Sequence, residues 1–211
     1  MNMCSKNTRS DKKLSTIQRQ ALVGLLLGDG NLQTESNGRT FRLRVCQSLA
    51  HKDYVFHLYE LFKDFTTSPP VESTEIDERT GQTYLSWSFS TTQQSCFRYY
   101  GQQFYDKKRV KRVPPIIARL LKPRSIAYWY MDDGAQKWKN VTKGVRFCTD
   151  NFQRREVKLL AKTLKDKYQL KTSLQKQRKD FRIYVSTNSY ETLKKLIWEY
   201  FIPSMLYKFP L

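Results

Sequence analysis

Two segments half a chain apart share one plan: an apolar run compatible with a helix, then an acid, then a glycine. They are residues 22–30 (LVGLLLGDG) and residues 126–134 (IAYWYMDDG). An acid directly after a buried apolar stripe is expected where a helix ends, and the following glycine is expected to supply a left-handed turn. If the two helices lie side by side, Asp29 and Asp133 become neighbours. Paired carboxylates hold hard divalent cations, which assist phosphodiester hydrolysis.

The intervals that follow the two segments also repeat. A cysteine in the first strand of each half (Cys46 and Cys148) and a lysine close to a proline at the end of each half (Lys111 and Lys208) occupy matching positions. Agreement at several positions favours duplication over coincidence. The simplest account is a homodimer whose two subunits are fused into one chain.

Hydrophobic periodicity predicts similar elements in both halves. In the first half we expect a helix at 15–28, a strand at 40–47, a helix at 51–65, a hairpin of strands 71–76 and 83–90, and a helix at 92–105. In the second half we expect a helix at 123–133, a strand at 144–149, a helix at 152–168, a hairpin of strands 172–177 and 181–186, and a helix at 190–201. The chain is therefore predicted to be an α+β protein with a flexible basic arm at residues 1–14 and two halves at 15–112 and 113–211.

The net charge of +19 narrows the class of partner. Lys and Arg number 38 against 19 Asp and Glu, and aromatic residues make up 14% of the chain. A basic folded domain is typical of proteins that bind polyanions, and the aromatic content favours nucleic acid over a disordered basic tail. No apolar run approaches the ~20 residues of a membrane span, and the first residues lack the apolar core of a signal peptide. The four cysteines form no zinc-binding or disulfide pattern, which indicates a reducing compartment.

The chemistry is expected where the two acid-ending helices meet. Gly24 and Gly28 share one helix face and would let another helix approach closely. Asp29 and Asp133 would then repel each other unless cations or protons neutralise them. Asp132, beside Asp133, is expected to end the helix or to support the metal site. The alternative is that both acids only cap their helices.

Three further side chains are predicted to assist. Lys111 and Lys208 would each stabilise negative charge developing on a scissile phosphate or position the attacking water, and a simple phosphate clamp explains them about equally well. Gln47 follows the first strand, and Thr149 and Asp150 stand near the corresponding place in the second half. Such residues would orient solvent, or they would serve only in turns.

Basic and amide side chains alternate with apolar residues along the predicted strands. A sheet with one face under helices leaves its other face open, and a β-ribbon fits the DNA major groove. We therefore predict that the open faces contact DNA, through Arg42, Arg44, Arg146, Gln175, Gln177 and Arg182.

With two such motifs at this separation, the chain resembles the LAGLIDADG homing endonucleases. The second motif and residues 202–210 (IPSMLYKFP) are most similar to the single-chain type encoded by yeast mitochondrial large-rRNA introns. The resemblance implies two pseudo-symmetric αββαββα halves, antiparallel sheets forming a saddle over DNA, and motif helices packed at the interface. It also implies site-specific cleavage of both strands of a long asymmetric target, leaving short 3′ overhangs and promoting intron homing, with Mg²⁺ as cofactor and Mn²⁺ as a substitute.

The resemblance also assigns roles to individual residues. Asp29 and Asp133 match the metal-binding acids, and the residues before them, Gly28 and Asp132, are included in the predicted metal site. The remaining matches are to catalytic residues, namely Lys111, Lys208 and Gln47. Tyr128 replaces the small residue typical of the motif.

Two other functions remain open. One is a group I intron maturase, which would bind intron RNA on the same fold, and the other is a DNA-binding regulator without catalysis. Both acids are present, which favours cleavage. His51 and His57 are expected on a helix surface or in packing, outside any His-Asn-His-like metal site. The partner is predicted to be double-stranded DNA, the protein a monomer, and its location a mitochondrion or chloroplast.

Overall fold

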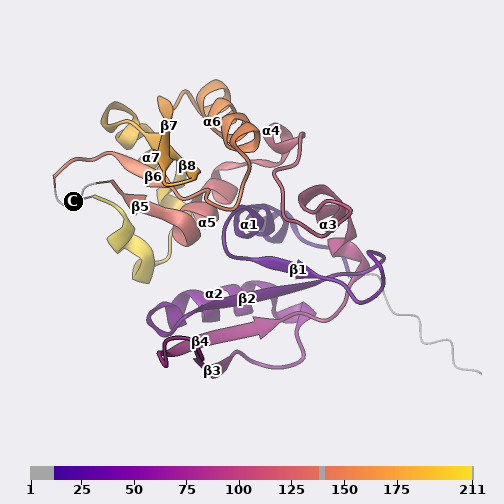
Figure 1. The fold of residues 1–211 in the computed structure, drawn as a ribbon. Coiled ribbons are helices and arrows are strands. Elements are labelled where there is room, and N and C mark those ends of the chain that lie inside the picture. The colour runs from indigo at the N-terminus through magenta and orange to yellow at the C-terminus, as the bar shows by residue number, and fades with distance from the viewer. Residues whose placement is uncertain (1–11, 138–140, 211) are drawn as a thin grey trace, which may run out of the picture.

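The protein contains two four-stranded antiparallel sheets with matching strand order (Figure 1). The structure is a computed structural model that describes residues 12–137 and 141–210. One sheet has the order β1-β2-β4-β3 and the other β5-β6-β8-β7. The predicted α+β fold with two similar halves is therefore confirmed. Residues 1–11 of the predicted arm lie outside the described residues, whereas Leu14, also assigned to that arm, is buried in the core.

The first half begins with a capped helix. Ser15 and Gln18 exchange side-chain and backbone hydrogen bonds in a capping box, which fixes the start of α1. The helices and strands of this half are α1 (Thr16–Leu27), β1 (Asn31–Gln33), β2 (Arg42–Ser48), α2 (Lys52–Phe62), β3 (Val71–Ile76), β4 (Thr83–Ser90) and α3 (Arg98–Phe104). A single 3-10 turn, Leu49–His51, leads into α2.

The second half repeats this order after one extra turn of helix. Its elements are α4 (Ile117–Leu120), α5 (Pro123–Asp133), β5 (Gly134–Gln136), β6 (Val145–Phe147), α6 (Arg154–Tyr168), β7 (Thr172–Gln177), β8 (Asp180–Val185) and α7 (Tyr190–Ile197). A 3-10 segment, Pro203–Lys208, follows and is called the C-terminal segment below. Within the described residues, no helix has the length and apolar character needed to cross a membrane.

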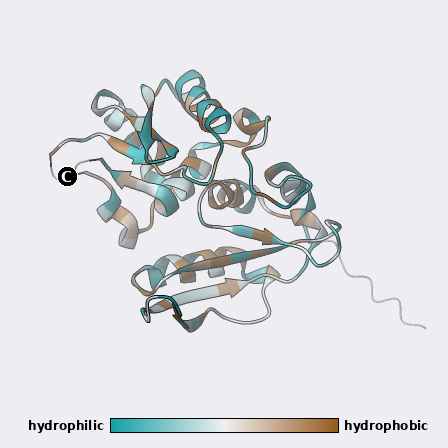
Figure 2. Ribbon diagram, viewed as in Figure 1, coloured by the Kyte–Doolittle hydropathy of each residue, from teal (hydrophilic) through white to brown (hydrophobic). Residues whose placement is uncertain are grey.

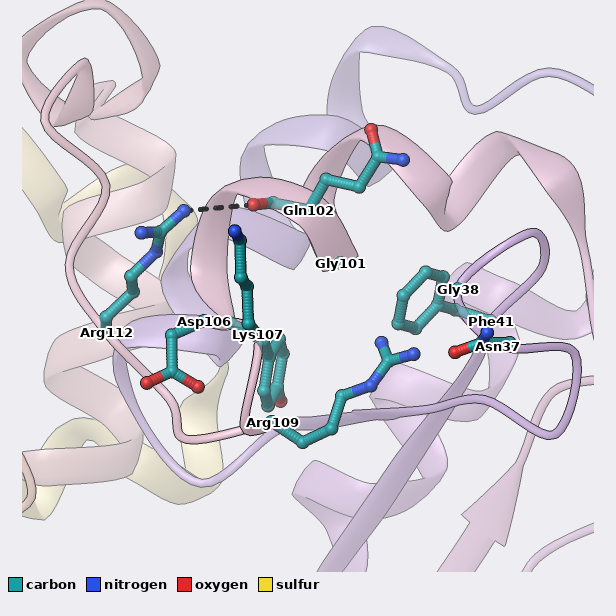
Figure 3. Close-up of a pocket in the computed structure, with 10 residues that line it drawn as sticks. Asn37, Gly38, Phe41, Gly101, Gln102, Asp106, Lys107, Arg109 and Arg112 are labelled. Atoms are coloured by element: carbon teal, nitrogen blue, oxygen red, sulfur yellow. Dashed lines mark hydrogen bonds between the residues drawn. The ribbon is translucent and has the colours of Figure 1, made fainter.

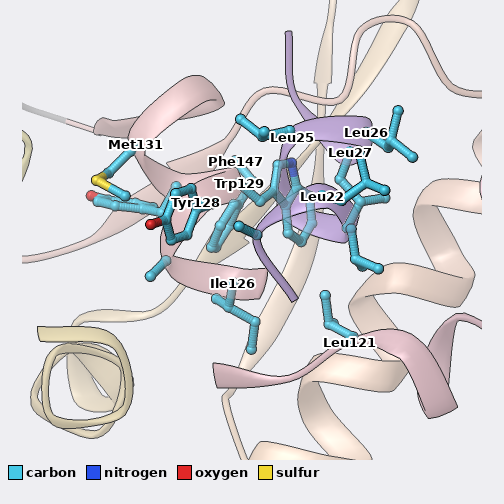
Figure 4. Packing of buried hydrophobic residues seen from close by; sticks show 14 of the residues in the cluster. Leu22, Leu25, Leu26, Leu27, Leu121, Ile126, Tyr128, Trp129, Met131 and Phe147 are labelled. Atoms are coloured by element: carbon cyan, nitrogen blue, oxygen red, sulfur yellow. The ribbon is translucent and has the colours of Figure 1, made fainter. Parts of the chain in front are cut away.

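The two motif helices, α1 and α5, pack against each other at the centre of the molecule (Figure 1). Helix α1 is hydrophobic along most of its length (Figure 2), and Leu22 and Leu25 join Trp129 of α5 in one buried cluster (Figure 4). A Cβ atom on Gly24 would lie 2.4 Å from the carbonyl oxygen of Ser125. The helix backbones are therefore closer than any side chain at position 24 allows.

Substituting Gly24 by alanine is expected to destabilise the protein. In an ordinary helix this change stabilises by roughly 0.5–1 kcal/mol. Here the new methyl group would meet the α5 backbone, so we expect the free energy of unfolding to fall by roughly 1–3 kcal/mol. Urea unfolding checks this, with Arg19→Ala on the exposed side of α1 as the control. A Gly24→Ala variant as stable as wild type would contradict the close helix contact.

The motif glycines do not form the left-handed turns predicted for them. Among the described residues, the glycines with positive φ are Gly38 and Gly81. Gly30 and Gly134 are required because there is no space for a side chain. A Cβ atom on Gly30 would lie 2.8 Å from Cβ of Leu25, and a Cβ atom on Gly134 would lie 2.3 Å from the Tyr130 ring. The chain turns directly into β1 and β5, which leaves no room for a side chain beside the helix.

Each sheet has one face under helices and one open face. Alternation along β2 buries Leu43 and Val45 and leaves Arg44 exposed, and Arg44 pairs with Ser90 across the strand. In the second sheet, Arg146 pairs with Tyr184 on the corresponding face. The open faces, defined by this register, are lined by polar and basic side chains.

Candidate active site

The two motif helices end at adjacent points. The backbone N–H of Asp29 donates to Oδ2 of Asp132 across the helix interface, at 3.1 Å. This contact exists because Gly28 has no side chain: a Cβ there would lie 2.4 Å from the Asp132 carboxylate. Asp132 therefore fills the space left by Gly28, and three carboxylates, those of Asp29, Asp132 and Asp133, gather at one end of the interface.

A lysine reaches each helix end; Lys208 is buried and Lys111 is partly buried. Nζ of Lys111 donates to the carbonyl oxygen of Gly28 at 2.6 Å, and Nζ of Lys208 donates to the carbonyl oxygen of Asp132 at 2.7 Å. Each carbonyl belongs to the residue before a motif acid. The two lysines thus occupy equivalent places, one in each half.

Both lysines are held by backbone anchors. Lys111 forms an isolated antiparallel bridge with Tyr105, whose hydroxyl accepts from the backbone N–H of Leu32 in β1 at 2.9 Å. The carbonyl oxygen of Lys208 accepts from the Tyr130 hydroxyl of α5 at 3.0 Å. The folded strands and helices therefore fix both ammonium groups before any substrate arrives.

Gln47 contacts the acids directly from the end of β2. Its side-chain nitrogen donates to Oδ2 of Asp29 at 2.9 Å and reaches Oδ1 of Asp132 at 3.4 Å. Thr149 follows β6 and occupies the position in the second half that corresponds to Gln47. Its hydroxyl donates to the carbonyl oxygen of Phe181 rather than to the acids. Gln47 of the first half thus bonds the acids directly, whereas Thr149 of the second half does not.

The carboxyl groups of Asp132 and Asp133 have raised pKa values because they are partly buried and lie close to each other and to Asp29. Burial and the neighbouring Asp29 carboxylate raise the pKa of Asp133 to about 7, although Lys111 and Lys208 oppose this shift. Burial, Asp29 and Asp133 raise the pKa of Asp132 well above its ordinary value. Burial lowers the pKa of both lysines, against the pull of the acids. A cation placed among these carboxylates would relieve their repulsion.

The raised pKa of Asp133 predicts a pH-dependent stability. The folded carboxyl group binds its proton more tightly than the unfolded one, whose pKa is near 3.8. The free energy of unfolding should therefore fall as pH rises from about 4 to about 7, by roughly 1–4 kcal/mol. Asp133→Asn should remove the part of this slope that Asp133 contributes in urea unfolding without divalent metal, while Asp132, whose pKa is also raised, keeps its own part. The exposed Asp64→Asn variant is the control, and an unchanged slope in Asp133→Asn would contradict the assignment.

The surroundings of Asp133 in the second half contain an additional ion pair, that of Asp150 with Arg182. A cavity of about 60 Å³ there is lined by Gly28, Lys111, Asp133, Cys148 and Asp150 among others. The Asp150 carboxylate faces it but accepts two bonds from Nε of Arg182, at 2.9 and 3.2 Å, and one from its terminal nitrogen at 2.5 Å. Asp150 is therefore neutralised by its own partner.

The predicted DNA-contacting residues lie on the open faces of the two sheets. Arg42 donates to Gln33 of β1 and forms an ion pair with Glu35, whereas Arg44 is exposed. Arg182 is committed to Asp150 and its side chain is only 21% exposed. The strand register places the others on the open face of the second sheet, namely Arg146, Gln175 and Gln177.

A larger basic depression lies away from the acids. It measures about 430 Å³ and lies between α3 and the β1–β2 loop (Figure 3). The guanidinium of Arg109 lies over the Phe41 ring at 5.6 Å, and Arg112 donates to the carbonyl oxygen of Gln102. None of the three motif-end carboxylates lines it, so this depression is separate from the candidate active site.

Sequence reasoning missed two residues near the acids. His51, expected only on a surface or in packing, lies 3.2 Å from Oε1 of Gln47. Its other ring nitrogen lies 2.9 Å from the hydroxyl of Tyr207 in the C-terminal segment. The only sequence signal is that His51 lies four residues after Gln47. Nothing local points to Tyr207.

The sequence was compared with known protein families. The profile described as the LAGLIDADG DNA endonuclease family matches residues 19–193, which include both motifs. The chain belongs to this LAGLIDADG family. It is an intron-encoded homing DNA endonuclease, so the predicted family and enzyme class are confirmed.

Individual relatives of this LAGLIDADG protein cover nearly its whole length. DNA endonuclease I-ChuI of Chlamydomonas applanata is 35% identical over 207 residues, covering 92% of this chain and 95% of its own. Cytochrome b mRNA maturase bI2 of Debaryomyces hansenii is 30% identical over 203 residues, covering 94% and 75%. Both nucleases and maturases therefore occur among the relatives.

Solved structures of relatives share the fold. The homing endonuclease I-WcaI, bound to its DNA recognition sequence, superposes with a TM-score of 0.88 and is 28% identical, covering 93% of this chain and 87% of that chain. I-DmoI in complex with DNA and Mn has a TM-score of 0.51 at 15% identity, covering 87% and 97%, which shows the fold alone.

Proposed function

We propose that this endonuclease hydrolyses both strands of a long, asymmetric DNA target in a Mg²⁺-dependent reaction. The products would carry short 3′ overhangs and promote insertion of the intron by recombination. The observation that carries the proposal is the pair of equivalent helix ends, each with an acid and a lysine bound to the preceding carbonyl.

The residues present fit a divalent cation. Asp29 and Asp133 supply carboxylate oxygens, and the carbonyl oxygens of Gly28 and Asp132 lie directly beside them. Within the described ranges, no group of three or more His, Cys, Asp or Glu side chains is arranged to hold a metal ion by itself, so water and substrate phosphate would have to complete the shell. Mg²⁺ commonly takes one or two carboxylates and completes its shell with water and substrate phosphate. When bound, the ion would lower the pKa of a water molecule and offset charge on the phosphate.

Side chains of the protein would stabilise the charge on the phosphate and orient the Asp29 carboxylate. The ammonium groups of Lys111 and Lys208 are fixed beside the two acids, so they would stabilise negative charge developing on the phosphate oxygens without reorganising. The amide of Gln47 would hold the Asp29 carboxylate in one orientation. Because the site is partly buried, these charges act more strongly there than at a fully solvated surface.

The open faces would position the DNA. Arg44 and Arg146 lie on the two open faces at matching strand positions. Their guanidinium groups would contact DNA phosphates or base edges. Since one chain carries both acids, we propose that a monomer is sufficient. The relatives that are intron-encoded endonucleases and cytochrome b mRNA maturases support a mitochondrial or chloroplast location.

The test is a cleavage assay on DNA that the protein binds. Plasmids spanning candidate intron-insertion sites of organellar genes, and a random-sequence duplex library, would be screened for binding and then incubated with Mg²⁺ or with EDTA. We expect double-strand cuts with short 3′ overhangs in Mg²⁺ only, with Mn²⁺ able to replace it. Absence of Mg²⁺-dependent cuts on a bound target would refute the proposal.

A second candidate function is a maturase activity on intron RNA. The outer side of α6 is basic and exposed, through Arg155, Lys158 and Lys165, while its inner side packs against β7 and β8. This surface faces away from the open sheet and is therefore free for a second polyanion. The maturase activity would be supported if Lys158→Glu weakens binding of the intron transcript and leaves DNA cleavage unchanged. It would be refuted if Lys158→Glu does not affect transcript binding.

A further inference from the structure

A chain of hydrogen bonds leads from the Asp29 carboxylate to the C-terminal segment. Gln47 bonds Asp29 with its nitrogen and meets Nδ1 of His51 with its oxygen, at 2.9 and 3.2 Å. Nε2 of His51 then lies 2.9 Å from the Tyr207 hydroxyl. The rings of His51 and Tyr207 are stacked, with an interplanar angle of 21°. The second half thus reaches the first half's acid through two side chains.

The direction of every bond in this chain follows from chemistry. Ionised carboxylates only accept, so the Gln47 nitrogen must face Asp29 and its oxygen must face His51. That oxygen also only accepts, so Nδ1 of His51 must carry a hydrogen. Burial and Lys208 lower the pKa of His51, which favours the neutral ring. Its Nε2 then accepts from the Tyr207 hydroxyl.

Without His51 the orientation of the amide would be less defined. An amide whose oxygen faced Asp29 would place two acceptors together, and a rotated amide would lose its contact with the acid. The N–H of His51 bonds the Gln47 oxygen, which disfavours both the flipped and the rotated amide. Tyr207 fixes the plane of the His51 ring, and its own backbone is held by Gln136, whose side-chain nitrogen donates to the Tyr207 carbonyl oxygen at 3.2 Å.

We propose that His51 is a positioning residue, held by Tyr207, that fixes the Gln47 amide against Asp29 and so supports cleavage of one DNA strand more than the other. The inference rests on the proposed nuclease function. It is one-sided because Thr149 bonds the Phe181 backbone in the second half, and Asp150 is occupied by Arg182. The C-terminal segment carries both Tyr207 and Lys208, so it contributes to both acid-bearing helix ends.

The test measures the two strands separately. A supercoiled plasmid carrying the cleavage site selected above would be cut by wild type, His51→Ala, His51→Asn and Tyr207→Phe, with the nicked and linear forms followed over time. Loss of a group that orients a metal ligand typically lowers activity 10- to 100-fold. We expect roughly this loss on one strand in His51→Ala, seen as accumulation of nicked plasmid, and a smaller effect in Tyr207→Phe.

The conservative variant and two controls separate positioning from structure. Asparagine at position 51 can still donate an N–H to Gln47, so His51→Asn should recover much of the lost rate. Tyr99→Phe, at an exposed tyrosine on α3, should cut like wild type, and thermal unfolding should show that every variant is folded. Equal slowing of both strands, wild-type cutting by His51→Ala, or no recovery in His51→Asn would each overturn the inference. A wild-type protein that does not cut would instead refute the proposed function.

Discussion

Asp29→Asn and Asp133→Asn are each expected to abolish double-strand cleavage while leaving DNA binding intact. Asparagine keeps the size of the side chain but removes the charge that would hold a cation and oppose the other acid. We expect the rate of double-strand cutting to fall by roughly 10³-fold or more. Binding is measured in EDTA by fluorescence anisotropy. It should be unchanged or slightly tighter, because one negative charge near the phosphates is removed.

The control for these variants is Asp64→Asn, which removes an exposed acid in the 3-10 turn that follows α2. It should cut like wild type. Asp132→Asn is a further comparison, because Asp132 accepts from the Asp29 backbone and lies between the two motif acids. If either Asp29→Asn or Asp133→Asn cuts both strands at the wild-type rate, the proposed metal site is misplaced.

Lys111→Met and Lys208→Met are expected to give the second largest loss of activity. Methionine keeps most of the side-chain length but has no charge to place beside the phosphate. Removing one preorganised charge of this kind costs roughly 10²- to 10³-fold in rate. Single-turnover cleavage of a bound target measures the loss, while anisotropy is expected to show little change in affinity because Lys208 is buried and Lys111 is partly buried.

Lys107→Met provides a matched control from the same loop, since this lysine is exposed and does not reach the acids. It should lower affinity slightly and leave the single-turnover rate unchanged. If Lys107→Met and Lys111→Met have equal effects, the lysines act only through general attraction for DNA. Wild-type rates in both buried-lysine variants would show that Lys111 and Lys208 only anchor the helix ends.

The regular helices and hairpins could be predicted because their signals are local. The α5 bounds and both β3 and β7 follow from periodicity and turn residues, and they agree with the structure. The short strands β1 and β5 were not found from their residues. Three residues are too few for a periodic pattern, and these strands exist only because β2 and β6 lie beside them.

The details of the candidate site depend on contacts that no local pattern records. The repeated acid and glycine predicted that Asp29 and Asp133 would approach, but the burial of Asp132 follows from the way its side chain enters the space above Gly28. The pairing of Arg182 with Asp150 joins residues in different elements, so the sequence did not indicate that an arginine predicted to contact DNA also bonds an acid of this chain. His51 and Tyr207 are 156 positions apart in the sequence.

The unequal faces of α1 and α5 limit how this protein can assemble. Two copies of the glycine face would lack the Tyr128 and Asp132 side chains that now fill the space beside Gly24 and Gly28, and two copies of the α5 face would bring those side chains against each other. Neither half therefore has a surface that complements itself, although each complements the other. A dimer of either half alone would lose the close central contact, so we expect neither half expressed separately to form a stable homodimer.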